Sequence, residues 1–174
     1  NAGPSQALAL RCGTTAPERQ SCDVAAGGWS CETGGMRAVV LHSYGGPEVL
    51  TIEEVADPVP GPDEVLVQVA ATALNRADLL QRMGLYPDPR KTKPEIPGLE
   101  FAGTVAAIGE RVSMWQVGDR VMGIDAGGAY AEKIATHERQ LLAVPAGIAL
   151  TDAAAIPEVF LTAWDALVVQ GGLT

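Results

Sequence analysis

Residues 98–105, GLEFAGTV, place one carboxylate, Glu100, inside a run of small and apolar residues. Removing a carboxylate from water is costly unless other groups pair with it. A buried acid in such a run is therefore a candidate for proton chemistry or for a structural hydrogen bond. The residue before it, Leu99, carries no chemistry of its own.

A second candidate group begins the segment NRADLLQRMG, residues 75–84, which we expect to form a helix. Asn75 stands where an N-cap residue would stand, and Asp78 occupies the third helical position, where its charge complements the positive helix end. Arg82 is four residues after Asp78, so these two side chains could form an ion pair. Taken alone, the residues favour helix capping over catalysis.

Two hydroxyl-bearing residues have equally plain interpretations. Tyr86 lies beside Pro87, where a tyrosine is usually a half-buried packing residue. Thr162 lies within an expected helix, where a threonine hydroxyl usually bonds to the preceding turn. The segment GGAYAEK, residues 127–133, precedes a strand and not a helix, so we interpret it as a bend of the sheet and not as a phosphate cradle.

The composition excludes several classes of protein. The chain has 174 residues with a net charge of −9, which argues against partners such as nucleic acid or an anionic membrane surface. No apolar run approaches the roughly 18 residues that span a bilayer. The three cysteines, Cys12, Cys22 and Cys31, form no C-x-x-C pair, so neither a disulfide framework nor a zinc site is expected.

The elements that position the candidate residues are mostly strands. Residues 1–35 show no periodicity, and we expect a disordered or non-native leader there. Alternating apolar residues and turn signals predict a mainly β (α+β) domain. The expected strands are 36–43, 50–55, 64–74, 100–109, 119–125, 129–136 and 141–145. Two further expected helices cover 150–157 and 158–170.

Six motifs in order, YGGPEVL, NRADLLQRMGLYP, PGLEFAGTV, VGDRVMG, GGAYAE and FLTAWDAL, resemble the zinc-free quinone oxidoreductases of the medium-chain dehydrogenase/reductase superfamily. The likeness is strongest to the p53-inducible type of NADPH quinone reductase and its bacterial relatives, and it covers residues 36–174. It implies a GroES-like, partly open β-barrel catalytic domain for residues 36–155. It also implies that residues 156–174 lead into a Rossmann domain. The chain contains no G-x-G-x-x-G turn, so we expect it to stop before that domain.

The resemblance also bears on metal binding. Zinc-dependent relatives hold their catalytic ion with residues at the positions of Asn75, Leu99 and Glu158. An amide and an alkyl chain at two of these positions are poor zinc ligands, so we expect no metal. The retained Glu100 is then expected to be a structural residue, paired with Arg76 or with a backbone donor, and not a general base.

The same resemblance implies roles for individual residues. Asn75, Arg76 and Ala77 would line the cofactor site for NADPH, and Thr162 would reach the cofactor near its nicotinamide. Tyr86 would be the catalytic residue, orienting a quinone carbonyl or lending it a proton. Asp78 and Glu100 would support the site from behind. Some relatives carry a second tyrosine at the position of Leu80, so a two-tyrosine mechanism is not expected here.

The leading hypothesis is a protein that transfers a hydride from NADPH to a quinone without zinc. Two alternatives stay open: a zinc-free enoyl reductase on the same scaffold, and a non-enzymatic GroES-like module for binding or oligomerisation. The resemblance further implies a small-molecule quinone as partner, a homodimer of the longer protein and a cytoplasmic location. It does not separate NADPH from NADH.

Overall fold

The computed structural model describes residues 34–86, 88 and 94–174. Almost all of the expected leader, and most of residues 87–93, therefore lie outside the described residues. The described part of the chain begins at Gly34, and its first strand begins one residue later.

All seven expected strands form. They are β1 (Gly35–Leu41), β2 (Leu50–Ala56), β3 (Glu64–Thr72), β4 (Glu100–Ile108), β5 (Arg120–Ile124), β6 (Lys133–His137) and β7 (Leu141–Ala143). The helices are α1 (Arg76–Arg82), α2 (Leu150–Ala153) and α3 (Pro157–Trp164), with the π-helical segment η3 (Asp165–Gln170) continuing α3. Short 3₁₀ turns, η1 (Pro47–Val49) and η2 (Glu138–Gln140), complete the described elements.

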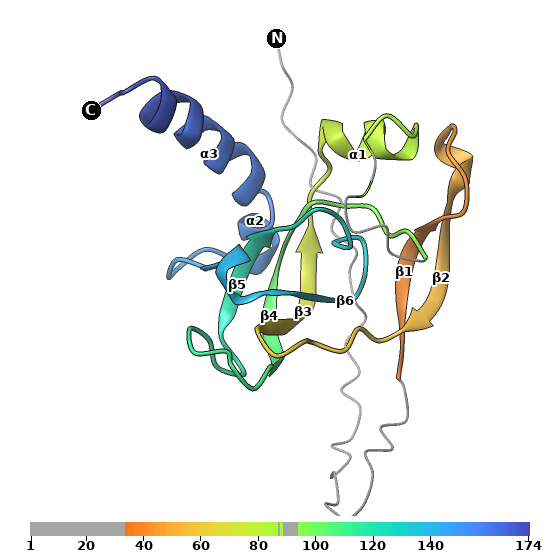
Figure 1. The fold of residues 1–174 in the computed structure, drawn as a ribbon, viewed down its shortest axis with the longest axis horizontal. Coiled ribbons are helices and arrows are strands. Elements are labelled where there is room, and N and C mark those ends of the chain that lie inside the picture. Colours follow the sequence, from red (N-terminus) through yellow and green to blue (C-terminus); the bar gives the residue numbers. More distant parts are fainter. Residues whose placement is uncertain (1–33, 87, 89–93) are drawn as a thin grey trace, which may run out of the picture.

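The strands form two antiparallel sheets. β1 and β2 pair as a hairpin, and the other five strands follow the order β6-β3-β4-β5-β7 (Figure 1). We expected a strand from residue 129, but β6 begins at Lys133, because residues 130–132 turn to meet β1. There the N–H of Val39 bonds to the Tyr130 carbonyl at 2.8 Å, and Ala38 forms a bridge with Ala131. This segment closes the two sheets into a partly open barrel.

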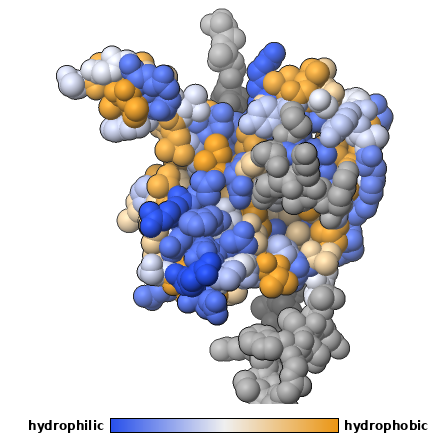
Figure 2. Space-filling view, viewed as in Figure 1, coloured by the Kyte–Doolittle hydropathy of each residue, from blue (hydrophilic) through white to orange (hydrophobic). Residues whose placement is uncertain are grey.

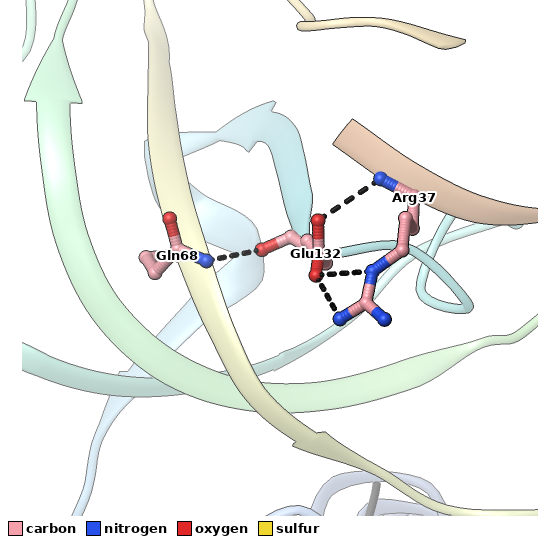
Figure 3. A network of polar contacts seen from close by, with 3 residues as sticks. All are labelled: Arg37, Gln68 and Glu132. Atoms are coloured by element: carbon pink, nitrogen blue, oxygen red, sulfur yellow. Dashed lines mark hydrogen bonds and ion pairs between the residues drawn. The ribbon is translucent and has the colours of Figure 1, made fainter. Parts of the chain in front are cut away.

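Side chains reinforce the junction between the sheets. The Arg37 guanidinium donates to Glu132 at 2.9 and 2.6 Å, and its backbone N–H donates to the same carboxylate at 2.9 Å (Figure 3). Gln68 of β3 donates to the Glu132 carbonyl at 2.9 Å. Lys133 pairs with Asp57 close by. Charged groups therefore fasten the β1–β2 hairpin to the larger sheet.

The core lies within the barrel. Val65, Val67 and Phe101 are fully buried, as the alternation along β3 predicts, and they pack with Val105 and Val121. Neighbouring buried residues complete this cluster: Ala129, Ile134 and Leu141. A smaller apolar cluster under α2 joins Ala102, Met122, Val144, Ala153 and Ala154.

The helix α3 and its continuation η3 differ from the barrel. Pro157 is buried at the start of α3, but the following apolar side chains are exposed, including Phe160 (65% exposed) and Trp164 (62% exposed). The helix projects from the barrel, and apolar residues are visible on its surface (Figures 1 and 2). Within the part of the chain that the structure describes, no helix is both long and apolar enough to cross a membrane.

Candidate functional site

The first turn of α1 is built around Asn75 and Asp78. Asn75 occupies the N-cap position with extended backbone angles, as the sequence predicts. The Asp78 carboxylate accepts the Asn75 backbone N–H at 2.6 Å, and the Asp78 N–H donates to the Asn75 carbonyl at 3.1 Å. These reciprocal bonds fix the turn between β3 and α1, which carries Asn75 to the surface of the barrel end.

Tyr130 holds the same turn from the other side. Its hydroxyl donates to the Asp78 carboxylate at 2.7 Å. Its ring lies against Gly98, whose φ is +95°, and a Cβ at that position would come within 2.3 Å of the ring. Burial, and then the bond to Asp78, raise the pKa of the Tyr130 hydroxyl well above its ordinary value, so it remains a donor. The sequence analysis missed this residue; the only signal was an aromatic residue directly after the Gly-Gly turn.

Asp78 is an incompletely paired acid. It is 5% exposed, and no described residue donates a hydrogen bond to its second oxygen, Oδ1. Burial raises its pKa, against the opposing effect of the bonds from Asn75 and Tyr130. The pair suggested for it, Arg82, instead donates to the Gly45 carbonyl at 3.0 Å, because α1 turns that side chain toward the β1–β2 hairpin.

Glu100 lies at the start of β4 and is 1% exposed. Its Oε1 accepts from the Asn75 side-chain amide at 2.8 Å, and its Oε2 accepts from the Glu158 backbone N–H at 2.9 Å. Of the two expected partners, the backbone donor is present, and Asn75 supplies the side-chain bond that was expected from Arg76. Burial raises the Glu100 pKa, the two bonds lower it, and the nearby charges of Glu158 and Asp78 raise it.

The structure brings only part of the predicted site together. Asn75, Asp78 and Glu100 are directly bonded, and Tyr130 joins them through Asp78. We call these four residues, with the Glu158 N–H, the Glu100 cluster. The remaining predicted residues occupy other positions. Arg76 is exposed and Ala77 half-buried in the first turn of α1; Thr162 is exposed on α3; and Tyr86 is 42% exposed beyond the other end of α1.

Two surface hollows lie near α1. One is lined by residues 41–44 and Glu95. The other is mainly apolar and is lined by Leu50, Leu74, Leu79 and Pro97, with Asp78, Arg82 and Tyr130 at its edge. Leu50 belongs to β2, so the second hollow lies between α1 and the hairpin. Neither hollow includes Asn75 or Thr162, the residues expected at the cofactor.

Two of the three positions of the zinc-dependent pattern, Asn75 and Leu99, carry side chains that are poor zinc ligands. Leu99 is an apolar residue, 6% exposed. Among residues 34–86, 88 and 94–174, no three His, Cys, Asp or Glu side chains are grouped so that they could hold an ion.

The family comparisons agree with this architecture. Residues 61–146 match the family model of the alcohol dehydrogenase GroES-like domain. These residues form a GroES-like domain of the medium-chain dehydrogenase/reductase superfamily. This confirms the expected fold class and the superfamily.

Two curated relatives show the range of proteins that carry similar domains. A synaptic vesicle membrane protein VAT-1 homolog-like protein of Mus musculus is 39% identical over 132 residues, which are 76% of this chain and 31% of that protein. A quinone oxidoreductase of Lama guanicoe is 38% identical over 135 residues, 76% of this chain and 40% of that protein. The chain thus spans 31% and 40% of the length of these two relatives.

Solved structures give the same result. The human VAT-1 homolog-like protein superposes with a TM-score of 0.76 at 36% identity, over 80% of this chain and 45% of that one. The Escherichia coli quinone oxidoreductase, solved with NADPH, superposes with a TM-score of 0.68 at 32% identity, over 75% of this chain and 40% of that one. The enoyl reductase CurK superposes with a TM-score of 0.69 at 31% identity, over 77% of this chain and 42% of that one.

Proposed function

We propose that this chain is the catalytic domain, residues 36–155, and the first linking helix, residues 156–174, of an oxidoreductase that transfers a hydride from NADPH to a quinone. The likeness to quinone oxidoreductases supports the reaction class. The observation that carries the proposal is Asn75, a half-buried amide held on Glu100 at the end of the barrel where α3 leaves. We also propose that this oxidoreductase is of the p53-inducible quinone reductase type.

The donor set suits the cofactor. Asn75, Arg76 and Thr162 offer an amide, a cation and a hydroxyl, each at least partly accessible, and these groups fit the polar, anionic character of NADPH. We assign them, with Ala77, to cofactor binding. When bound, NADPH supplies the hydride. Asp78 and Glu100 fix the turn that presents Asn75, and neither faces solvent as a general base would.

Tyr86 is the proposed catalytic residue. The residue is 42% exposed, so a substrate can reach its side chain. It would donate a hydrogen bond to one quinone oxygen and pass its proton there as that oxygen gains charge, after which solvent returns the proton to the tyrosine. The quinone takes up one hydride and one proton, giving the hydroquinone. Because a quinone is already a strong electron acceptor, this chemistry needs no metal to polarise it.

The test is NADPH oxidation by the longer protein that joins this domain to a nucleotide-binding domain. We expect turnover with 1,2- or 1,4-quinones, a raised KM for NADPH in Asn75→Ala, and a lowered kcat in Tyr86→Phe. Tyr44→Phe is the matched control, because Tyr44 is also exposed but lies on the hairpin, bonded to Glu95. Turnover of enoyl thioesters alone would contradict the quinone assignment.

The likeness to an enoyl reductase makes reduction of an activated C=C bond the second candidate. The two activities are separated by the same assay with an enoyl thioester in place of the quinone. A binding or oligomerisation module without activity is the third; it predicts no NADPH oxidation with either substrate. We also propose, from the resemblance alone, that the longer protein is a cytoplasmic homodimer.

A further inference from the structure

The Glu100 carboxylate is the meeting point of three elements. Glu100 begins β4, Asn75 caps α1 and Glu158 lies in the first turn of α3. Each oxygen of the carboxylate serves a different helix: Oε1 accepts from Asn75 at 2.8 Å, and Oε2 accepts from the Glu158 N–H at 2.9 Å. One side chain, 1% exposed, therefore connects the beginnings of two helices whose first residues, Arg76 and Pro157, are 81 residues apart in the chain.

We propose that Glu100 is a positioning residue, which fixes the first turn of α1 relative to the first turn of α3. This inference rests on the proposed function in one respect: α1 and α3 carry the assigned cofactor residues Asn75 and Thr162, so their relative position would set the cofactor site. The connection itself is a property of the described chain and is testable without any cofactor.

The chemistry of the two donors requires the ionised form. Asn75 Nδ2 and Glu158 N are both donors, and a carboxylate accepts on both of its oxygens. A proton on either oxygen turns one of them into a donor and weakens one connection. Three titratable groups face Glu100: Asp78 on α1, Glu158 on α3, and Tyr130, which bonds to Asp78. The charges of the two acids disfavour the ionised form of Glu100 and raise its pKa. Acidification therefore protonates Glu100 and weakens the connection.

This connection is important because α3 packs on the barrel only near its first turn. Pro157 is buried, whereas Val159, Phe160 and Leu161 are all more than 40% exposed. The packing of α3 on the barrel is thus confined to its first turn, where the Glu158 N–H is bonded. We therefore expect a substitution at Glu100 to disturb this first turn before the rest of α3.

The experiment is a pH titration of the 174-residue chain by NMR, following the Glu158 backbone amide and the Asn75 side-chain amide. We expect both resonances to titrate with one midpoint, that of Glu100, and the shared midpoint to vanish in Glu100→Gln. In Asn75→Ala the midpoint at the Glu158 amide should move to higher pH, because a bond that favours the ionised form is lost. Leu74→Ala, at the exposed neighbouring residue, should leave it unchanged.

Glu100→Asp keeps the negative charge of the side chain but shortens it, so this variant separates the effect of charge from that of side-chain length. Its carboxylate is one methylene shorter, so it should not serve both donors at once, and we expect hydrogen exchange of the Glu158 amide to accelerate about fivefold to tenfold, the equivalent of one ordinary hydrogen bond. In the longer protein the same variant should raise the KM for NADPH with little change in kcat. An unchanged Glu158 midpoint in Asn75→Ala would overturn the connection itself. A shifted midpoint with an unchanged KM would uphold the connection and contradict the cofactor assignment instead.

Discussion

Two buried glutamates, at two places in one barrel, bond to backbone N–H groups with opposite electrostatic outcomes. Glu138, in η2, accepts from the N–H groups of Ser113 and Met114 at 2.9 and 3.0 Å, and its carbonyl accepts from the Trp115 indole at 2.8 Å. We call these residues the Glu138 cluster. The bonds from Ser113 and Met114 lower the Glu138 pKa, and the nearby basic side chains of Arg139 and His137 act in the same direction. The Glu100 pKa is raised.

The surroundings explain the difference. Glu138 is 8% exposed and has basic side chains nearby, whereas Glu100 is 1% exposed and the charged neighbours that act on it are the acids Asp78 and Glu158. The Glu138 cluster thus anchors a loop in a way that favours folding. The Glu100 cluster keeps an unfavourable charge in place, and such arrangements concentrate at functional sites. This contrast supports placing the site at the α1 and α3 end of the barrel.

The largest effect is expected from glycine substitutions at the two places. Gly98 and Gly118 have φ values of +95° and +97°, but only Gly98 has neighbours at the Cβ position, with the Tyr130 ring 2.3 Å away. Gly118 lies in the loop that Glu138 anchors. Both Ala variants carry the same backbone strain, so Gly98→Ala should be the less stable by about 1–3 kcal/mol, the cost of overpacking. Urea unfolding measures the difference; equal losses would show that Tyr130 moves aside freely.

In Gly98→Ala the cost of overpacking adds to the strain of a positive φ, so its total loss should exceed the loss from removing the Tyr130 hydroxyl. Tyr130→Phe keeps the ring against Gly98 but removes one of the two hydrogen bonds that the Asp78 carboxylate accepts from described residues, and the bond from the Asn75 N–H remains. We expect a loss of about 1–3 kcal/mol. The control is Tyr44→Phe, which also removes a hydroxyl from a carboxylate, that of Glu95, at a more exposed position. A greater loss in the control would contradict the importance of the Glu100 cluster.

The smallest expected effect is the dependence of stability on pH, for which Glu100 and Glu138 should differ in sign. The raised Glu100 pKa contributes stability that is present below the ordinary value of 4.5 and is lost as pH rises through the raised value. The stability of the unmodified chain relative to Glu100→Gln should therefore fall as pH rises above 4.5. The lowered Glu138 pKa acts in the opposite sense, and stability relative to Glu138→Gln should fall as pH drops below 4.5. Thermal unfolding from pH 3 to pH 8 tests both; slopes of the same sign would remove the contrast between the two clusters.

The sequence by itself determined the strands, the helix at 75–84 and the class of fold. Alternation of apolar residues along β3 and the cap residues Asn75 and Asp78 are local signals, because side-chain period and helix capping depend on neighbours in the chain. Ordered motifs also predicted the superfamily, which the comparisons confirmed.

Only the tertiary structure decided the partners of the buried charges. Glu100 meets Asn75 and Glu158, which lie 25 and 58 residues away, and Tyr130 reaches Asp78 across 52 residues. No local pattern encodes such pairs, since they depend on which loops the partly open barrel brings to one end. For the same reason the expected pairs of Glu100 with Arg76 and of Asp78 with Arg82 were plausible by spacing and were replaced by others, once α1 turned Arg82 toward the hairpin and left Arg76 exposed.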